Sequence, residues 1–174
     1  MRKNQTLQLF GYILILVFFN QCQQTLKNQM AKRWNEEKAW AWQKHHGWLV
    51  GTNFNPSSAI NQLEFWQEDT FDPQTIDLEL EWSSELGMNL HRVYLHNLLW
   101  EQDSIGFLKR LDTYLDMSYS KGIKTLFVLL DDVWHPVPKL GKQPEPIPFV
   151  HNSGWVQAPG AAILGDSLRH YELE

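Results

Sequence analysis

Asp131 and Asp132 are the side chains of this sequence best suited to acid–base chemistry, because they stand together directly after an apolar run. In such a pair, one carboxyl group can deliver a proton while the other accepts one. Neighbouring residues at the end of a strand point to opposite sides, however, so we expect at most one of the two to face a common site. We therefore predict no catalytic residue from this pair.

A metal site is the second chemistry to consider, with His96, Asp131 and His135 as its candidate ligands. These residues do not have the close, regular spacings of metal-binding motifs. Single histidines are more often hydrogen-bonded structural groups. We predict neither a metal ion nor a cofactor.

Three apolar runs, rich in Val, Leu and aromatic residues, end in polar or aromatic side chains. The runs are residues 48–53, 89–101 and 124–136, and the side chains at or near the predicted strand ends are Asn53, His96, Asp131 and Trp134; Arg92 lies within the second strand. This pattern is typical of buried parallel strands whose C-terminal ends open into a site. The last two runs repeat after about 35 residues, the length of a βαβ unit. We predict an α/β fold with its site at the strand ends.

Helical patterns separate these runs. The clearer one lies between Asp72, which suits an N-cap, and Gly87, which suits a C-terminal cap, with Pro73 at the first helical position. A longer helix is expected over residues 104–120, with one apolar face formed by Leu108, Leu111 and Leu115. The predicted order is therefore β-α-β-α-β.

Residues 131–160 form a connection with six prolines, far longer than an ordinary βα loop. It carries Trp134, His135, His151, Asn152 and Trp155. The chain has nine Trp, which suit a surface that stacks on flat or sugar-like ligands, although Trp also fills protein cores. We predict that this connection is part of a binding surface.

Composition and charge exclude one class of partner. The 174 residues are 43% hydrophobic and 13% aromatic, which is enough to bury a core. The net charge is -5 and no basic stripe is present, whereas nucleic-acid binding needs clustered Lys and Arg to neutralise phosphates. We expect no nucleic-acid partner.

The N-terminus has the pattern of an export signal. Arg2 and Lys3 precede an apolar stretch at residues 9–19, which is short for a membrane span. Cys22, the single cysteine, follows directly, so residues 1–22 are predicted to be either a lipoprotein signal that lipidates Cys22 or a plain signal peptide or anchor. Residues 23–46 are predicted to be a tether followed by a short helix.

Several long motifs resemble one family. They are GTNFNPSSAINQLEFWQEDTFDP, HRVYLHNLLWEQD, GIKTLFVLLDDVWHPVPKLGKQPEP and HNSGWVQAPG. Together they resemble bacterial secreted glycoside hydrolases of the cellulase-like (β/α)8 type, often described as β-xylanase-like. The resemblance covers roughly residues 34–160. It implies a TIM barrel whose active site lies at the C-terminal face of its strands.

The resemblance also implies where catalysis would sit. Enzymes of this type use two carboxylates about 5 Å apart, which come from strands four and seven. The acid/base normally lies in an Asn-Glu-Pro motif, and this triplet does not occur here. We expect residues 47–174 to be the N-terminal part of such a barrel, about its first three βα units, and to be inactive alone.

The roles implied for individual residues concern binding and support. An Arg at the position of Arg92 hydrogen-bonds the nucleophilic carboxylate in the resembling enzymes; a structural ion pair is the alternative. Asn53, His96 and Asp131 would contact sugar hydroxyls and Trp134 and Trp155 would stack on sugar rings, unless they serve packing roles.

The expected function is that of an exported protein acting on β-linked polysaccharide of the xylan, cellulose or mannan class, in the periplasm, in the outer membrane or on the surface of a bacterium. The protein would contact the membrane only through the signal or a lipid anchor. Two alternatives remain open: a non-catalytic carbohydrate-binding cell-surface protein, and an inactive remnant.

Overall fold

The computed structural model describes residues 33–163 of the chain. The chain divides into two compact units, residues 1–47 and 48–174. The predicted signal at residues 1–22, Cys22 included, and most of the predicted tether lie outside the described residues. No helix between residues 33 and 163 is long and apolar enough to cross a membrane.

The first unit contains helix α2 (Glu36–His46). Asn35 caps this helix, because its side-chain oxygen accepts a hydrogen bond from the Lys38 N–H at 2.9 Å. The Lys38 ammonium group lies 4.5 Å from the centre of the Trp34 ring. The helix predicted at the end of residues 23–46 is confirmed.

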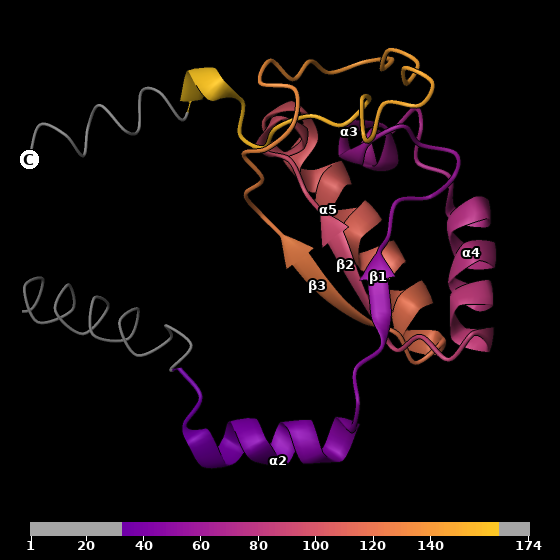
Figure 1. Cartoon of the computed structure of the whole chain (residues 1–174), viewed down its shortest axis with the longest axis vertical. Helices are drawn as coiled ribbons and strands as arrows, with labels where there is room; N and C mark the ends of the chain where they lie inside the picture. The colour runs from indigo at the N-terminus through magenta and orange to yellow at the C-terminus, as the bar shows by residue number, and fades with distance from the viewer. Residues whose placement is uncertain (1–32, 164–174) are drawn as a thin grey trace, which may run out of the picture. The chain divides into compact units, whose positions relative to one another are not determined.

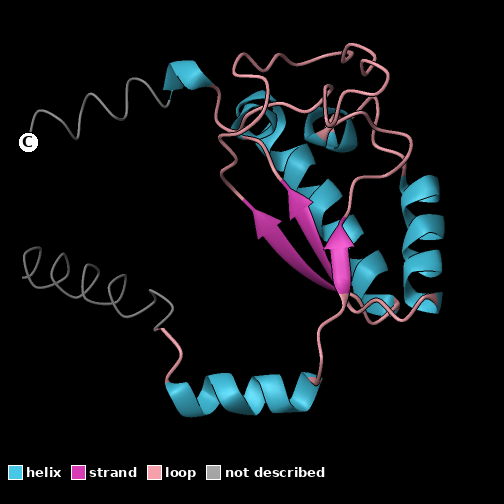
Figure 2. Cartoon of the chain, in the orientation of Figure 1, coloured by secondary structure: helices cyan, strands magenta, loops and turns pink. Residues whose placement is uncertain are grey.

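The second unit is built on a three-stranded parallel sheet (Figures 1 and 2). Its strands, in spatial order, are β1 (Gly51–Asn53), β2 (Leu90–Tyr94) and β3 (Lys124–Val128). The helices that connect them are α3 (Gln62–Trp66) and α4 (Pro73–Glu85) before β2, and α5 (Asn97–Ser120) before β3. The predicted α/β class and element order are confirmed, and the described residues form three strands of a sheet rather than a closed barrel.

Helix α4 begins and ends where its local sequence predicts. The Asp72 carboxylate accepts hydrogen bonds from the N–H groups of Gln74 and Thr75, at 3.2 and 3.1 Å. Pro73 is its first residue, and Gly87 follows the helix with a φ of 80°, which favours glycine. All of these signals act within one helical turn, so neighbouring residues suffice to specify them.

Helix α5 begins earlier than predicted. It starts at Asn97, so residues 97–101, expected at the end of a strand run, are helical. The side chain of His96 caps this start, because its Nδ1 accepts the Leu98 N–H at 3.1 Å. The helical dihedral angles are interrupted at Asp103, and a second segment follows over the predicted range.

The core lies between one face of the sheet and the helices, with α5 behind the sheet in Figure 1. Helix α5 contributes Phe107 and Tyr114 to it, which are buried. Leu108 and Leu115, expected on the apolar face, are 47% and 36% exposed. Leu111 packs against the core, so the predicted face is confirmed at Leu111 and wrong at Leu108 and Leu115, where Phe107 and Tyr114 fill the core instead.

The other face of the sheet exposes side chains. Val93 of β2 is fully buried, whereas its neighbour Arg92 points to the opposite side and is exposed. Asn53 of β1 and Leu126 of β3 pair with Arg92 in the sheet register and share its side. We call Asn53, Arg92 and Leu126 the open face.

Candidate functional site

Four aromatic side chains form a continuous row from the end of β2 into the loop after β3. Tyr94 contacts Trp155 with ring centres 5.1 Å apart, and Trp155 contacts Trp134 at 5.7 Å. Trp134 in turn contacts His151 at 5.9 Å. All three contacts are edge-to-face, at interplanar angles of 77°, 63° and 67°. We call these four residues the aromatic row; it brings together the predicted site residues Trp134 and Trp155.

Arg92 extends the row onto the open face. The carbon of its guanidinium group lies 4.7 Å from the centre of the Tyr94 ring, and its Nη1 donates a hydrogen bond to the Tyr94 hydroxyl. Within residues 33–163 no carboxylate forms an ion pair with Arg92. Asn53 is its register partner on β1. A cation therefore stands beside the first ring of the row, and Asn53 pairs with that cation's residue in the sheet.

The structure gives His96 a structural environment. Its side chain is buried, and besides capping α5 its Nε2 hydrogen-bonds the backbone oxygen of Gln157 at 2.8 Å. Nδ1 acts as an acceptor, so Nε2 must carry the proton of a neutral ring. Burial lowers the pKa of His96, which favours this neutral form. Both ring nitrogens are thus engaged by the protein itself.

Asp131 and Asp132 lie in different environments. The backbone of Asp131 exchanges two hydrogen bonds with Ala158, at 2.6 and 2.7 Å. Its Oδ2 is buried and accepts no hydrogen bond from any described residue, while Oδ1 accepts only a long one from the Val133 N–H, at 3.4 Å. Asp132 is exposed. Asp131 therefore keeps one carboxylate oxygen buried without a donor among the described residues, and Asp132 faces solvent.

Buried amide side chains hold the loop after β3 against α3. Asn61, the N-cap of α3, donates to the Gln143 side chain at 3.0 Å and to the Gly154 oxygen at 2.8 Å. Gln62 donates to the Val156 oxygen at 2.7 Å. These bonds join residues more than 80 positions apart in sequence, and two of the acceptors, Gly154 and Val156, flank Trp155. We call Asn61, Gln62 and Gln143 the amide clamp.

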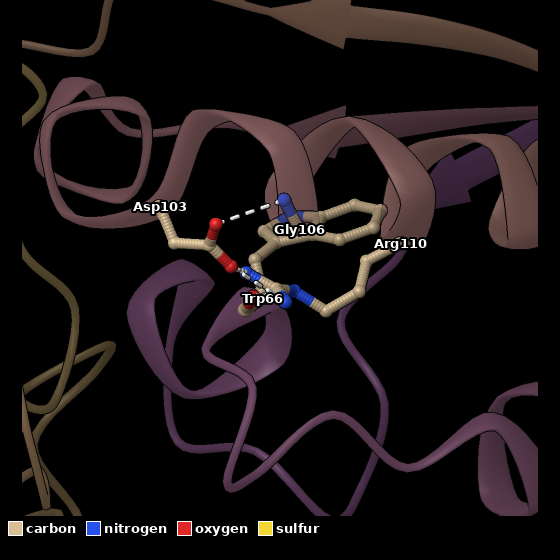
Figure 3. Close-up of polar contacts among 4 residues, drawn as sticks. All are labelled: Trp66, Asp103, Gly106 and Arg110. Atoms are coloured by element: carbon tan, nitrogen blue, oxygen red, sulfur yellow. Dashed lines mark hydrogen bonds and ion pairs between the residues drawn. The ribbon is translucent and has the colours of Figure 1, made fainter.

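A second set of contacts joins the break in α5 to Trp66 (Figure 3). At the break in α5, Asp103 accepts the Gly106 N–H at 2.9 Å and pairs with Arg110 at 3.4 Å. The Arg110 Nε donates to the Trp66 backbone oxygen at 2.6 Å, and the Trp66 indole donates to the Tyr94 backbone oxygen at 2.9 Å. The break in α5 is therefore linked to the first residue of the aromatic row.

Sequence reasoning did not find either set of supporting residues. A cluster of amides at residues 61–67 was visible in the sequence, but its partners lie in the distant loop. Arg110 was not singled out by any pattern in the sequence.

A cavity of about 400 Å³ opens inside the loop, beside Trp155. Its polar lining comes from His135, Lys139, Lys142, Gln143 and Ser153. No acidic residue lines it within the described part of the chain. Between residues 33 and 163, no group of three or more His, Cys, Asp or Glu side chains is placed to hold a metal ion.

The arrangement as a whole can bind a flat, hydroxyl-rich ligand. The partly exposed rings of Trp134 and Trp155 offer apolar surface, and Arg92 and Asn53 offer polar groups on the neighbouring open face. Comparisons of the chain with protein-family models, with curated proteins and with solved structures found no match.

Proposed function

We propose that this chain forms the first three βα units of a (β/α)8 glycoside hydrolase that acts on β-linked polysaccharide of the xylan, cellulose or mannan class. In this proposal the units present here bind sugar. The aromatic row at the C-terminal ends of parallel strands carries the proposal, because that edge is where barrels of this kind hold their ligands.

The sheet is consistent with a segment of such a barrel. Its strands are parallel and follow one another in chain order, with the core on the helix side. The open face would then point into the barrel, which gives exposed Arg92 and Leu126 a reason to lie side by side in register. A three-stranded sheet of this order also occurs in open α/β folds, so the family motifs of the sequence favour the barrel.

The catalytic carboxylates would belong to strands that follow β3 in the barrel. A retaining glycosidase needs two carboxyl groups about 5 Å apart that face the same sugar. Asp131 is partly buried and Asp132 is exposed, so this neighbouring pair lacks that arrangement. Arg92, without a carboxylate partner among residues 33–163, would hydrogen-bond the nucleophile.

A non-catalytic carbohydrate-binding protein is the second candidate. The observation that favours it is the presence of a complete aromatic row without a carboxylate pair in the described residues. Both candidates would act outside the cytoplasm, because the basic start and apolar residues 9–19 favour export, with Cys22 as a proposed lipid anchor.

Calorimetric titration with β-1,4-linked xylo-, manno- and cello-hexaose tests sugar binding. We expect binding that Trp155→Ala weakens about tenfold, equivalent to about 1.4 kcal/mol. The control is Trp82→Ala, which removes an indole that is 53% exposed on α4, away from the row. Absence of binding, or equal weakening by both variants, would contradict the proposal.

A reducing-sugar assay tests whether the chain hydrolyses polysaccharide or only binds it. The chain alone is expected to release nothing from xylan, mannan or cellulose. If it does hydrolyse one of them, and Asp131→Asn or Asp132→Asn abolishes the turnover, the chemistry belongs to these residues and our placement of the carboxylates is wrong.

A further inference from the structure

The cavity inside the loop is lined by basic side chains, whereas the chain as a whole is acidic. Two lysines, Lys139 and Lys142, and His135 line it, although the chain as a whole has a net charge of -5. Neither lysine forms an ion pair with a described residue. The lining therefore presents cations that the described protein leaves uncompensated.

Two acidic residues close to this segment, Glu64 and Glu145, do not neutralise the lysines of the cavity. Glu64 approaches from α3, but it is buried, and its two carboxylate oxygens accept the backbone N–H groups of Gln143 and Ile60, both at 2.9 Å. Glu145 follows Pro144 in sequence and is not among the lining residues. The residues that line the cavity are therefore basic, polar, aromatic or apolar, and none is acidic.

The backbone that carries the lysines is fixed. The Gln143 Nε2 donates to the oxygens of Lys139 and Gly141, at 2.9 and 2.7 Å, and Gly141 turns the chain with a φ of 94°. Gln143 itself is held by Asn61 of the amide clamp. Because this segment is already folded around Gln143, little loop ordering would oppose binding of a ligand.

The cavity adjoins the aromatic row, since Trp155 belongs to both. A sugar ring stacked on Trp155 would bring a substituent of that ring, or of the next one, to the lysines. Ammonium groups bind carboxylate and sulfate oxygens by charge-assisted hydrogen bonds.

We propose that this cavity is a subsite for an acidic sugar unit, in which Lys139 and Lys142 bind a carboxylate or sulfate group while Trp155 stacks on the ring. The proposal rests on the proposed function, because it assumes that the aromatic row binds saccharide. It narrows the substrate class to β-linked polysaccharides that carry anionic units.

Three matched trisaccharides test the subsite on the full chain: cellotriose, the β-1,4-linked glucuronic acid trisaccharide that differs from it only at the C6 carboxylates, and 6-O-sulfated cellotriose. We expect an anionic trisaccharide to bind at least tenfold more tightly than cellotriose. Lys139→Gln and Lys142→Gln should each weaken anionic binding about fivefold, as expected for an exposed charge pair, and leave cellotriose binding unchanged. Lys109→Gln, on the exposed side of α5, is the control and should change neither.

Salt gives a second readout. Raising NaCl should weaken binding of the acidic trisaccharide and leave cellotriose binding nearly constant, because salt screens exposed charges. Tight binding of only one anionic form supports the subsite and identifies its substituent.

Equal affinity for all three sugars overturns the subsite and leaves the proposed function standing. Preference for the acidic sugars that survives the double Lys139→Gln, Lys142→Gln change also overturns it. If none of the three binds, the proposed function fails, and the subsite fails with it.

Discussion

At the scale of single residues, His96 connects α5 to the loop through one neutral ring. Its Nδ1 accepts the Leu98 N–H and its Nε2 donates to the Gln157 oxygen, so protonation of Nδ1 would break the cap of α5. Burial lowers the pKa of His96, and of buried His91, below the ordinary value of 6.5. The unfolded chain therefore binds these protons more readily than the folded chain does.

The free energy of unfolding should depend on pH for this reason. The contribution of a base with a lowered pKa is complete above pH 6.5, the value for the unfolded chain, and is lost as the pH falls from there through the lower pKa of the folded chain. We expect the urea midpoint to fall between pH 7.5 and pH 5.5. His96→Gln should reduce this pH dependence and cost roughly 1 to 3 kcal/mol at pH 7.5, because a buried hydrogen-bonding group is lost.

His45→Gln is the control for this measurement, since His45 lies on α2 and is exposed. A midpoint that rises on acidification, or a His96→Gln variant with the full pH dependence of the parent, would show that the neutral ring is not the cause.

The role expected for His96 illustrates what sequence can and cannot predict about a site. Its position at a strand end was evident, and so was the gathering of Trp134 and Trp155 near that end. Whether an imidazole faces a ligand or a backbone oxygen depends on the path of a loop some 60 residues away, since the partner oxygen is that of Gln157. No local pattern contains that information.

At the scale of elements, the break in α5 at Asp103 acts as an internal N-cap. Asp103→Ala would remove both the acceptor for the Gly106 N–H and the partner of Arg110. We expect it to lower the free energy of unfolding by about 1 to 2 kcal/mol, the usual cost of a lost N-cap. Asp112→Ala, an exposed change further along α5, should cost less than 0.5 kcal/mol.

Thermal unfolding of the two variants side by side measures this difference. If Asp103→Ala is as stable as Asp112→Ala, the break needs no cap and the link from Arg110 to Trp66 does not depend on Asp103.

The loop after β3 should depend on the amide clamp. Gln143→Ala leaves the Asn61 amide without its side-chain partner and frees the segment that carries Lys139 and Lys142. We expect trypsin to cut after these lysines several times faster in the variant, because cleavage follows the population of opened loop. Gln102→Ala, exposed on α5, should leave the cleavage rate unchanged.

Mass mapping of early tryptic fragments measures the rate of cleavage after Lys139 and Lys142. Unchanged cleavage at Lys139 and Lys142 in Gln143→Ala would mean that the loop is held by other contacts.

The elements differ in how well the sequence predicted them, and the reason is physical. Helix α4 was correct at both ends because Asp72, Pro73 and Gly87 act on their immediate neighbours. Helix α5 was expected to begin too late because residues 97–101 continue an apolar run, and its start is set by the side chain of His96. The buried face of α5 is set by the packing of Phe107 and Tyr114 rather than by Leu108 and Leu115.

At the scale of the whole molecule, the second unit exposes apolar side chains on the open face and on α5. Leu126 on the open face is 53% exposed, and Leu108 on α5 is 47% exposed. β3 pairs with β2 on one side, and within the described residues no strand pairs with its other side. Unpaired edges and apolar faces of this kind favour association.

We therefore expect the protein to self-associate in solution once the predicted signal, residues 1–22, is removed. Leu126→Lys should shift it towards monomer by placing a charge on the open face. Leu86→Lys, at a residue that is 76% exposed after α4, should not. Sedimentation velocity over a range of protein concentrations measures the shift. A monomeric parent, or an equal response to both changes, would indicate that the open face is stable in water.

The central claim of this account is that the aromatic row binds β-linked saccharide, and the indole N–H signals of the tryptophans in a ¹⁵N–¹H NMR spectrum test it most directly. On addition of cellohexaose or xylohexaose, we expect the Trp134 and Trp155 signals, assigned with Trp→Phe variants, to shift with saturation. The signals of buried Trp66 and exposed Trp82 should stay in place. Shifts confined to Trp82 and other tryptophans outside the row, or no shifts at all, would contradict the claim.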